Sequence, residues 1–326
     1  MSSATRTGSN SRFVIVSGVL LALLVVASVV SLRTGLAESS FDIVANIRAP
    51  RIALAIVVGV GLAIAGALMQ GLFQNPLADP AIIGVSPASA VGAVAAAALG
   101  AAFNLPAAAI AATVVAIIGL GVVVSVSRLD GRTQTVTLLL AGVAVASFAG
   151  ALLAVLISVN AGAGVRPLSF WLGGSFALST WTGVATTVPF VVIGTVIAII
   201  LGRSIDLFSL GERNAESMGV HVDRTRLLGM LASVLLVAAG VAVAGVIAFV
   251  GLVIPHAVRA MIGPAHRQLM VASGLAGALL LVIADLLART LAAPIEIPVG
   301  AITALVGAPI FFFLLRRTRA DQGGWG

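Results

Sequence analysis

The sequence contains no cysteine, no tyrosine and no lysine, so all 18 of its basic residues are arginines. Without cysteine there is no disulfide, no thiolate metal ligand and no cysteine nucleophile. Without lysine the phosphate-binding motif G-x-x-x-x-G-K-[ST] cannot occur, so if ATP drives this protein another chain must hydrolyse it. Charged residues are scarce as well and make up only 9% of the chain.

Apolar residues fill the space that charges leave. Of the 326 residues 60% are hydrophobic, and the mean hydropathy is +1.20, whereas soluble domains are about half apolar and about a quarter charged. In lipid every backbone polar group must be bonded internally, so the sequence predicts an all-α polytopic membrane protein. The net charge of +7 then indicates arginine-rich cytoplasmic loops, and no nucleic-acid partner is expected.

Ten apolar segments are expected to be transmembrane helices. The first has 20 residues, which exceeds the apolar region of a signal peptide and matches the roughly 20 residues that cross hydrocarbon, so it is interpreted as a retained helix. The stretch 227–262 is broken by Gly240, Gly245, Gly251 and Pro255 and predicts one full helix followed by a short one. The predicted spans are 13–32, 52–73, 81–103, 106–127, 135–159, 183–202, 227–244, 246–258, 268–288 and 298–315.

The arginines predict the orientation of these helices. With the N-terminus in the cytoplasm, 13 of the 18 arginines fall on the cytoplasmic side, as the positive-inside rule requires. We therefore expect a multi-pass protein of the cytoplasmic (inner) membrane with both termini inside, tails at 1–12 and 317–326, and one transmembrane domain over 13–316. The five outer arginines are Arg33, Arg48, Arg51, Arg166 and Arg289.

Ionisable groups are nearly absent from the spans. Asp285 is their only carboxylate, near the outer end of its helix, whereas ion-driven carriers need titratable groups near the midplane. An ion-coupled secondary transporter is therefore a remote alternative. A membrane enzyme is more remote, because His221, His256 and His266 form no H-E-x-x-H pair. No catalytic residue, metal ligand or cofactor is predicted in this chain.

A polar loop follows the second span and reads Q-N-P-L-A-D-P over residues 74–80. Its two prolines end the helix and stiffen the turn. Taken alone, the loop predicts a tight cytoplasmic turn.

The connection over residues 203–226 is longer than a plain turn requires. Within it Leu210, Ala215 and Met218 recur at helical spacing, with a glycine at each end of the segment. This pattern predicts a short amphipathic helix suited to docking in the groove of a partner. A surface turn is the alternative.

Four segments in order resemble the FecCD-type permeases, the ten-helix membrane subunits of ABC importers with the type II permease fold. The resemblance extends over about residues 48–315 and implies that the chain is not itself an enzyme. The segments are R-A-P-R at 48–51 leading to Gln70 and N-P-L-A-D-P, L-L-L-A-G-V at 138–143, L-G-E-x-x-A-x-x-x-G at 210–219, and F-V-G-L-x-x-P-H-x-x-R at 249–259 followed by E-I-P-V-G at 296–300.

The resemblance also implies an assembly. It implies a homodimer, or a heterodimer with a close paralogue, with a translocation path between the two copies. Two cytoplasmic ABC ATPase subunits would bind ATP and Mg, and an extracytoplasmic binding protein would deliver the cargo. The expected cargo is a ferric siderophore, with haem or cobalamin as alternatives, and the expected mechanism is alternating access driven by the ATPases.

Site residues follow from the resemblance only where the motifs match. Asn75, Pro76 and Leu77 match an inner gate loop, and Thr135 matches a second cytoplasmic gate. Val136 departs from the family pattern, which has a hydroxyl residue there. The residues that match the ATPase-coupling segment are Gly211, Glu212, Ala215, Met218 and Gly219.

The resemblance further implies that Arg48, Arg51 and Arg289 form a basic rim for acidic residues of the binding protein. The residues themselves leave two simpler alternatives open. The arginines could extend to lipid headgroups. They could instead pair locally, since Arg289 lies four residues after Asp285 and on the same helical face.

Overall fold

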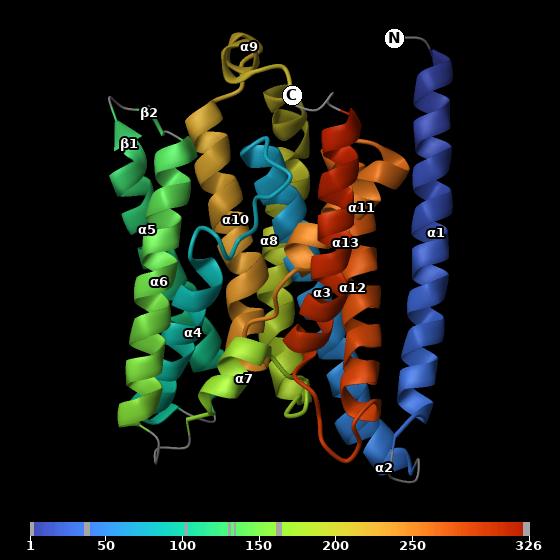
Figure 1. Ribbon diagram of the computed structural model, residues 1–326, viewed down its shortest axis with the longest axis vertical. Coiled ribbons are helices and arrows are strands. Elements are labelled where there is room, and N and C mark those ends of the chain that lie inside the picture. The colour runs from blue at the N-terminus through green and yellow to red at the C-terminus, as the bar shows by residue number, and fades with distance from the viewer. Residues whose placement is uncertain are drawn as a thin grey trace.

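Helices form nearly the whole of the structure, a computed structural model that describes residues 3–35, 40–101, 104–129, 132–133, 135–160 and 165–321 (Figure 1). The elements are α1 (Ser3–Arg33), α2 (Phe41–Ile43), the π-helix η1 (Val44–Arg48), α3 (Ala49–Leu72), α4 (Val85–Ala96), the π-helix η2 (Ala97–Ala101), α5 (Leu105–Ser127), β1 (Arg128–Leu129), β2 (Arg132–Thr133), α6 (Thr135–Val159), α7 (Leu168–Gly173), α8 (Trp181–Phe208), α9 (Glu212–Ser217), α10 (Val222–Ala244), α11 (Val250–Ile262), α12 (His266–Thr290) and α13 (Val299–Asp321). The two strands pair antiparallel and close the turn between α5 and α6.

The ten predicted spans are all found as helices. Within the described residues seven helices are long and apolar enough to cross a membrane, and three shorter apolar helices accompany them at Val85–Ala101, Val250–Ile262 and Val299–Phe312. The stretch 227–262 divides as predicted into a full helix, α10, and the short helix α11. The multi-pass, all-helical class is therefore confirmed.

The two ends of the bundle carry different elements. The start of α1, the end of α13 and α9 lie at one end, whereas α2 and α7 lie at the other (Figure 1). Because the first and last helices share an end, the chain crosses the bundle an even number of times. The side of the membrane that each end faces remains a prediction from the arginine distribution.

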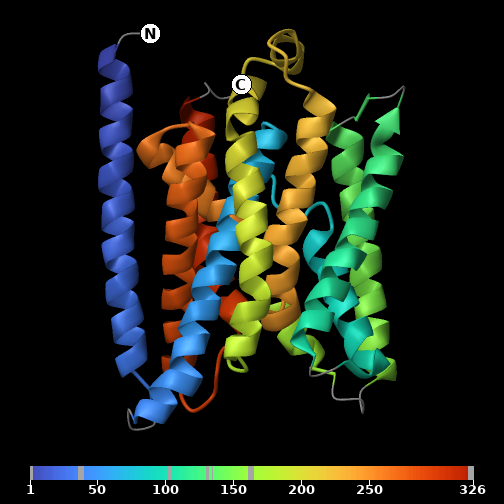
Figure 2. The ribbon, with the colours of Figure 1, turned by 180° about the vertical axis from the view of Figure 1, so that it is seen from behind.

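Burial is uneven across the bundle. The most apolar stretches of the spans that end in α3 and α10 are each 78% buried, whereas the most apolar stretch of α1 is only 6% buried. Accordingly α1 stands apart at one edge in both views, while α3 and α10 run through the interior (Figures 1 and 2). Gly59 of α3 and Gly277 of α12 face each other so closely that an added Cβ at either would overlap the other's backbone. Small residues thus let these helices pack backbone to backbone.

Several local elements differ from the predicted spans. The span expected at 81–103 begins only at Val85, because turns occupy the four residues before it. The chain between α3 and α4 descends to about mid-height before α4 begins (Figure 1). The elements α2, η1, α7 and the β1–β2 pair were not predicted, because each is too short to produce a clear apolar periodicity.

The arrangement of the ends predicts opposite accessibility for two serines. Ser169 in α7 and Ser217 in α9 are both exposed and lie at opposite ends of the bundle. Since the chain has no cysteine of its own, Ser169→Cys and Ser217→Cys should each give a single thiol. A membrane-impermeant maleimide added to intact cells should label only the Ser169→Cys variant. Labelling of both thiols from one side would contradict the ten-helix arrangement.

Candidate functional site

The loop that follows α3 is a rigid turn held by its own polar side chains. The Leu77 amide donates to Asn75 Oδ1 at 2.9 Å, and the Ala81 amide donates to Asp79 Oδ1 at 2.8 Å. Gln74 has a positive φ of 47° and its side chain donates back to the Gly71 carbonyl. Asn75 and Pro76 are half-buried and Leu77 is exposed. The loop is therefore the tight turn that the prolines predict.

This loop lies against the start of α11. Gln70, 1% exposed, donates through Nε2 to the carbonyls of Gly251 at 3.3 Å and Leu252 at 3.1 Å. A Cβ added at Gly251 would lie only 2.7 Å from Asp79 Oδ2, and one added at Gly66 would overlap the Gly251 backbone. The glycines thus let α3, the loop and α11 meet without intervening side chains.

The end of the same loop contacts α6. A Cβ added at Gly142 would lie 2.7 Å from the Ile83 Cα, so the Leu138–Val143 run of α6 packs directly on the turn before α4. Thr135, the second predicted gate residue, begins α6, but its side chain lies outside the described residues. Val136 next to it is 71% exposed. Because of this contact, a movement of α6 would displace the turn before α4.

A second break in the helices, at residues 245–249, is held by α7 and the residues after it. Gly245 has a φ of +77°, and an added Cβ there would overlap the Phe170 carbonyl. The Val246 amide donates to the Trp171 carbonyl at 3.0 Å, and the Ser175 amide donates to the Ala244 carbonyl at 2.8 Å. The W-L-G-G-S segment at 171–175 thus supplies hydrogen-bond partners for backbone groups beside the α10–α11 break.

The short helix α9 confirms the predicted helix in the 203–226 connection. Leu210 and Met218 are 52% and 61% exposed, whereas Ala215 is fully buried. Ala215 therefore packs inward and anchors the helix, and it does not face a partner as the sequence suggested. Gly211 and Gly219 take positive φ values of +92° and +86° at the two ends.

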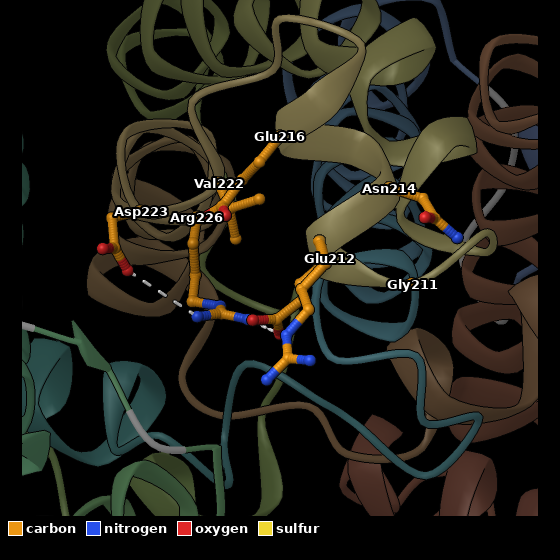
Figure 3. A pocket seen from close by; sticks show the side chains of 8 residues that line it. Gly211, Glu212, Asn214, Glu216, Val222, Asp223 and Arg226 are labelled. Atoms are coloured by element: carbon orange, nitrogen blue, oxygen red, sulfur yellow. Dashed lines mark hydrogen bonds and ion pairs between the residues drawn. The ribbon is translucent and has the colours of Figure 1, made fainter.

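One buried arginine ties α9 to α10. Arg226, 2% exposed, donates through Nη2 to Glu212 Oε1 at 2.5 Å, and Asp223 lies 3.9 Å from its Nη1. Figure 3 shows this pair at the edge of a cavity of about 370 Å³ that Asn214 and Glu216 also line. Glu212, one of the residues matched to the coupling segment, therefore has a basic partner within the chain, and its carboxylate offsets the buried charge of Arg226.

The outer arginines are likewise engaged inside the protein. Arg51, 8% exposed, contacts Asp285 at 2.8 Å and Glu296 at 2.8 Å. Asp285, 1% exposed, lies 4.0 Å from Arg289 Nε. The pairing of Asp285 with Arg289 that the i, i+4 spacing suggested is therefore secondary to its pairing with Arg51.

The other two arginines cap the C-terminal end of α1. Arg48, 5% exposed, donates to the Leu32 carbonyl at 2.8 Å. Arg289 donates to the carbonyls of Thr34 and Ser31. Cations at a helix C-terminus are favoured by the helix dipole. Arg48 and Arg51 are buried and Arg289 is half-buried, and their contact with a binding protein stays a prediction.

The predicted site residues therefore form separate groups. Asn75, Pro76 and Leu77 lie between α3 and α4, α9 lies at one end, and the three arginines lie toward the other end. Sequence reasoning did not predict the backbone hydrogen bonds between α7 and the α10–α11 break. Gly174 and Gly245, which allow this close approach, were the available signal. Within the described part of the chain no group of three or more His, Cys, Asp or Glu could hold a metal ion.

In the described part of the chain, ten apolar helices, two breaks within the bundle and a short helix projecting from one end define a multi-pass membrane protein. The same arrangement is found in a solved structure described as an inward-facing conformation of a metal-chelate type ABC transporter. That chain has 33% sequence identity and a TM-score of 0.82, and the match covers 93% of this chain and 99% of that one.

The chain belongs to the FecCD transport family, whose model matches residues 13–317. It is 44% identical over 298 residues to the cobalamin import system permease protein BtuC of Halobacterium salinarum, covering 90% of this chain and 78% of that protein. It is 38% identical over 327 residues to the hemin transport system permease protein HmuU of Yersinia pestis, covering 94% and 97%. The resemblance inferred from the motifs is thus confirmed, and the chain is an ABC importer permease.

The buried ion pair predicts a clear stability difference between two substitutions. Asp285→Asn should lower the free energy of unfolding by about 3 kcal/mol or more, because it leaves the Arg51 charge buried with one partner fewer. Glu296→Gln should cost about 1 kcal/mol or less, since the Glu296 side chain is 38% exposed. Denaturant unfolding of the purified variants in one detergent measures both. Equal losses would show that Asp285 is not the principal partner of Arg51.

Proposed function

We propose that this chain forms the translocation path of an importer whose ATP is hydrolysed by separate ATPase subunits. The observation that carries this is the exposed helix α9, fixed to the bundle by Arg226 and presenting Leu210 and Met218 outward. The absence of lysine from the chain supports a separate ATPase. On this proposal two such ATPases, bearing ATP and Mg, would receive α9 in a groove.

Coupling would then pass from α9 into the bundle. Glu212 and Asp223 pair with Arg226 at the start of α10. A displacement of α9 would therefore move α10 with it as one rigid body. At its far end α10 reaches the break with α11, and α11 lies on the Asn75–Asp79 loop through Gly251. We propose that this chain of contacts opens and closes the gate formed by Asn75, Pro76 and Leu77, with Thr135 on α6 as the second gate.

A second copy of the chain, or of a close paralogue, would complete the path. Val136, Leu140 and Val143 lie on one face of α6 at helical spacing, and each is more than half exposed. Gly142 on the same helix packs on the turn at 82–83, at the end of the loop that contains Asn75, Pro76 and Leu77. A partner on this face would therefore bring two gate loops together on one axis. The binding protein would dock at the opposite end, where α2 and α7 lie.

The proposed cargo is a ferric siderophore. The solved metal-chelate type transporter is matched over nearly its full length, and a ferric siderophore is a metal chelate. The similarity to permeases named for cobalamin and hemin makes these two chelates the second candidates. Asp285, the only carboxylate within the predicted spans, is paired with Arg51, so we propose that the binding protein would carry most of the selectivity.

The coupling role of α9 is tested by Met218→Glu. A glutamate at this exposed position leaves the internal contacts of the chain intact but places an unpaired charge in the proposed ATPase interface, at a cost of about 2 kcal/mol or more. We expect substrate-stimulated ATP hydrolysis by the assembled importer to fall by about tenfold or more. Met218→Leu, which keeps the apolar surface, should retain it. Unchanged stimulation in the glutamate variant would refute the docking role.

The cargo is tested by uptake into proteoliposomes that contain the permease, its ATPase and its binding protein. We expect ATP-dependent accumulation of a labelled ferric siderophore, with haem and cobalamin failing to compete at equal concentration. Accumulation of haem or cobalamin in place of the iron chelate would reassign the cargo. Uptake that required a proton gradient and no ATP would contradict the importer itself.

A further inference from the structure

A cavity of about 470 Å³ opens near the end of the bundle that carries α7. Its wall is largely apolar and is formed by small or aliphatic side chains of α4, η2 and α5, among them Ala97, Leu105 and Ala108. Arg166, which precedes α7, and Trp171 within α7 line the same cavity, and Thr182 at the start of α8 adds a hydroxyl. The cavity therefore combines an apolar wall with a cationic and hydrogen-bonding edge.

The cation in this cavity has no anionic partner among the described residues. Arg166 donates through Nη1 to the Val243 carbonyl at 2.7 Å and lies 4.3 Å from the centre of the Phe170 ring. No carboxylate among the described residues forms an ion pair with it, in contrast to Arg51 and Arg226. Burial lowers the pKa of Arg166, because the charged guanidinium loses part of its solvation. An anion placed here would restore that stabilisation.

A second donor points to a ligand as well. Trp171 is 3% exposed, and its Nε1 has no hydrogen-bond partner within the described part of the structure. An indole N–H buried without an acceptor is costly and uncommon. Trp171 and Arg166 line the same cavity, so a single ligand that carries acceptor oxygens can approach both.

The depth of the cavity indicates the source of the ligand. It lies where the membrane-spanning helices α5 and α8 begin, and Trp181 and Leu178 beside it are 51% and 62% exposed. Tryptophan and arginine at helix ends are typical of the level of lipid headgroups. At this level an apolar chain can run along α4 and α5 while a charged head remains at Arg166.

We propose that the cavity binds an anionic phospholipid, whose phosphate lies at Arg166 and whose acyl chain lies along the apolar wall of Ala97, Leu105 and Ala108. The lining matches an amphiphile, because it combines one cation and hydrogen-bond donors with several small apolar residues. The lipid would join α4, α5, α7 and α8 at the point where Trp171 and Val243 adjoin the α10–α11 break. It would thereby stabilise the contact of α7 with that break.

Native mass spectrometry and thermal unfolding in nanodiscs test this proposal. The full chain should retain dioleoylphosphatidylglycerol and unfold at a higher temperature with it than with dioleoylphosphatidylcholine. Arg166→Gln should weaken phosphatidylglycerol retention by about tenfold, as expected for the loss of one charge-assisted hydrogen bond. Ala97→Phe, which fills the apolar wall and leaves the charge, should weaken retention of the lipid as well.

Two controls separate the sources of the effect. Arg33→Gln removes an exposed arginine near the same end but outside the cavity, and it should leave retention unchanged. Inorganic phosphate in place of lipid should not raise the unfolding temperature. Equal stabilisation by inorganic phosphate, or equal retention of phosphatidylglycerol by the wild type and both cavity variants, would overturn the proposal.

Discussion

The structure of this protein depends on one constraint: backbone amides and carbonyls must find hydrogen-bond partners where water is absent. Unbroken helices such as α3 and α10 satisfy their own amides and carbonyls. The two breaks in the bundle, at 73–84 and 245–249, lack a continuous helical pattern of hydrogen bonds. The side chains of Asn75 and Asp79 accept from amides of the first break, and the backbone of α7 and Ser175 bonds to the second. Irregular backbone is tolerated in this bundle because other parts of the chain cover it.

The same constraint governs the charges. Arg51 and Asp285 are both nearly inaccessible and neutralise each other, and Glu296 completes the pair from the connection before α13. The only carboxylate within the predicted spans is therefore occupied, which argues against ion coupling from the geometry as well as from the composition. Arg48 and Arg289 donate hydrogen bonds to carbonyls at the C-terminal end of α1. Of the seven long apolar helices in the described residues, α1 is the least buried. These arginines hold an outlying helix to the bundle, a role that sequence reasoning assigned to none of them.

The exposed parts of the chain differ between the two ends. At one end Leu210 and Met218 project from a helix that a buried arginine fixes in place, which suits transmission of force from a partner. At the other end a cavity is bordered by Arg166, which forms no ion pair with a described carboxylate, and by Trp171, whose indole N–H lacks an acceptor in the described structure. The first arrangement fits a protein groove, and the second fits an amphiphilic anion. Both are connected to the α10–α11 break, the first through α10 and the second through Val243 and Trp171.

The sequence by itself determined the ten spans, the division of 227–262 at its glycines, the short helix within 203–226 and the family, because apolar periodicity, glycine spacing and local motifs are properties of neighbouring residues. Only the tertiary structure decided the partners of the polar groups. Arg51 lies 234 residues before Asp285 in the chain, and Glu212 and Arg226 belong to different helices. Nothing in the local pattern distinguishes an arginine that will be buried against a distant carboxylate from one that will be exposed. That choice depends on which helices the packing of small residues brings together, and so it could not be read from the spacing of charges.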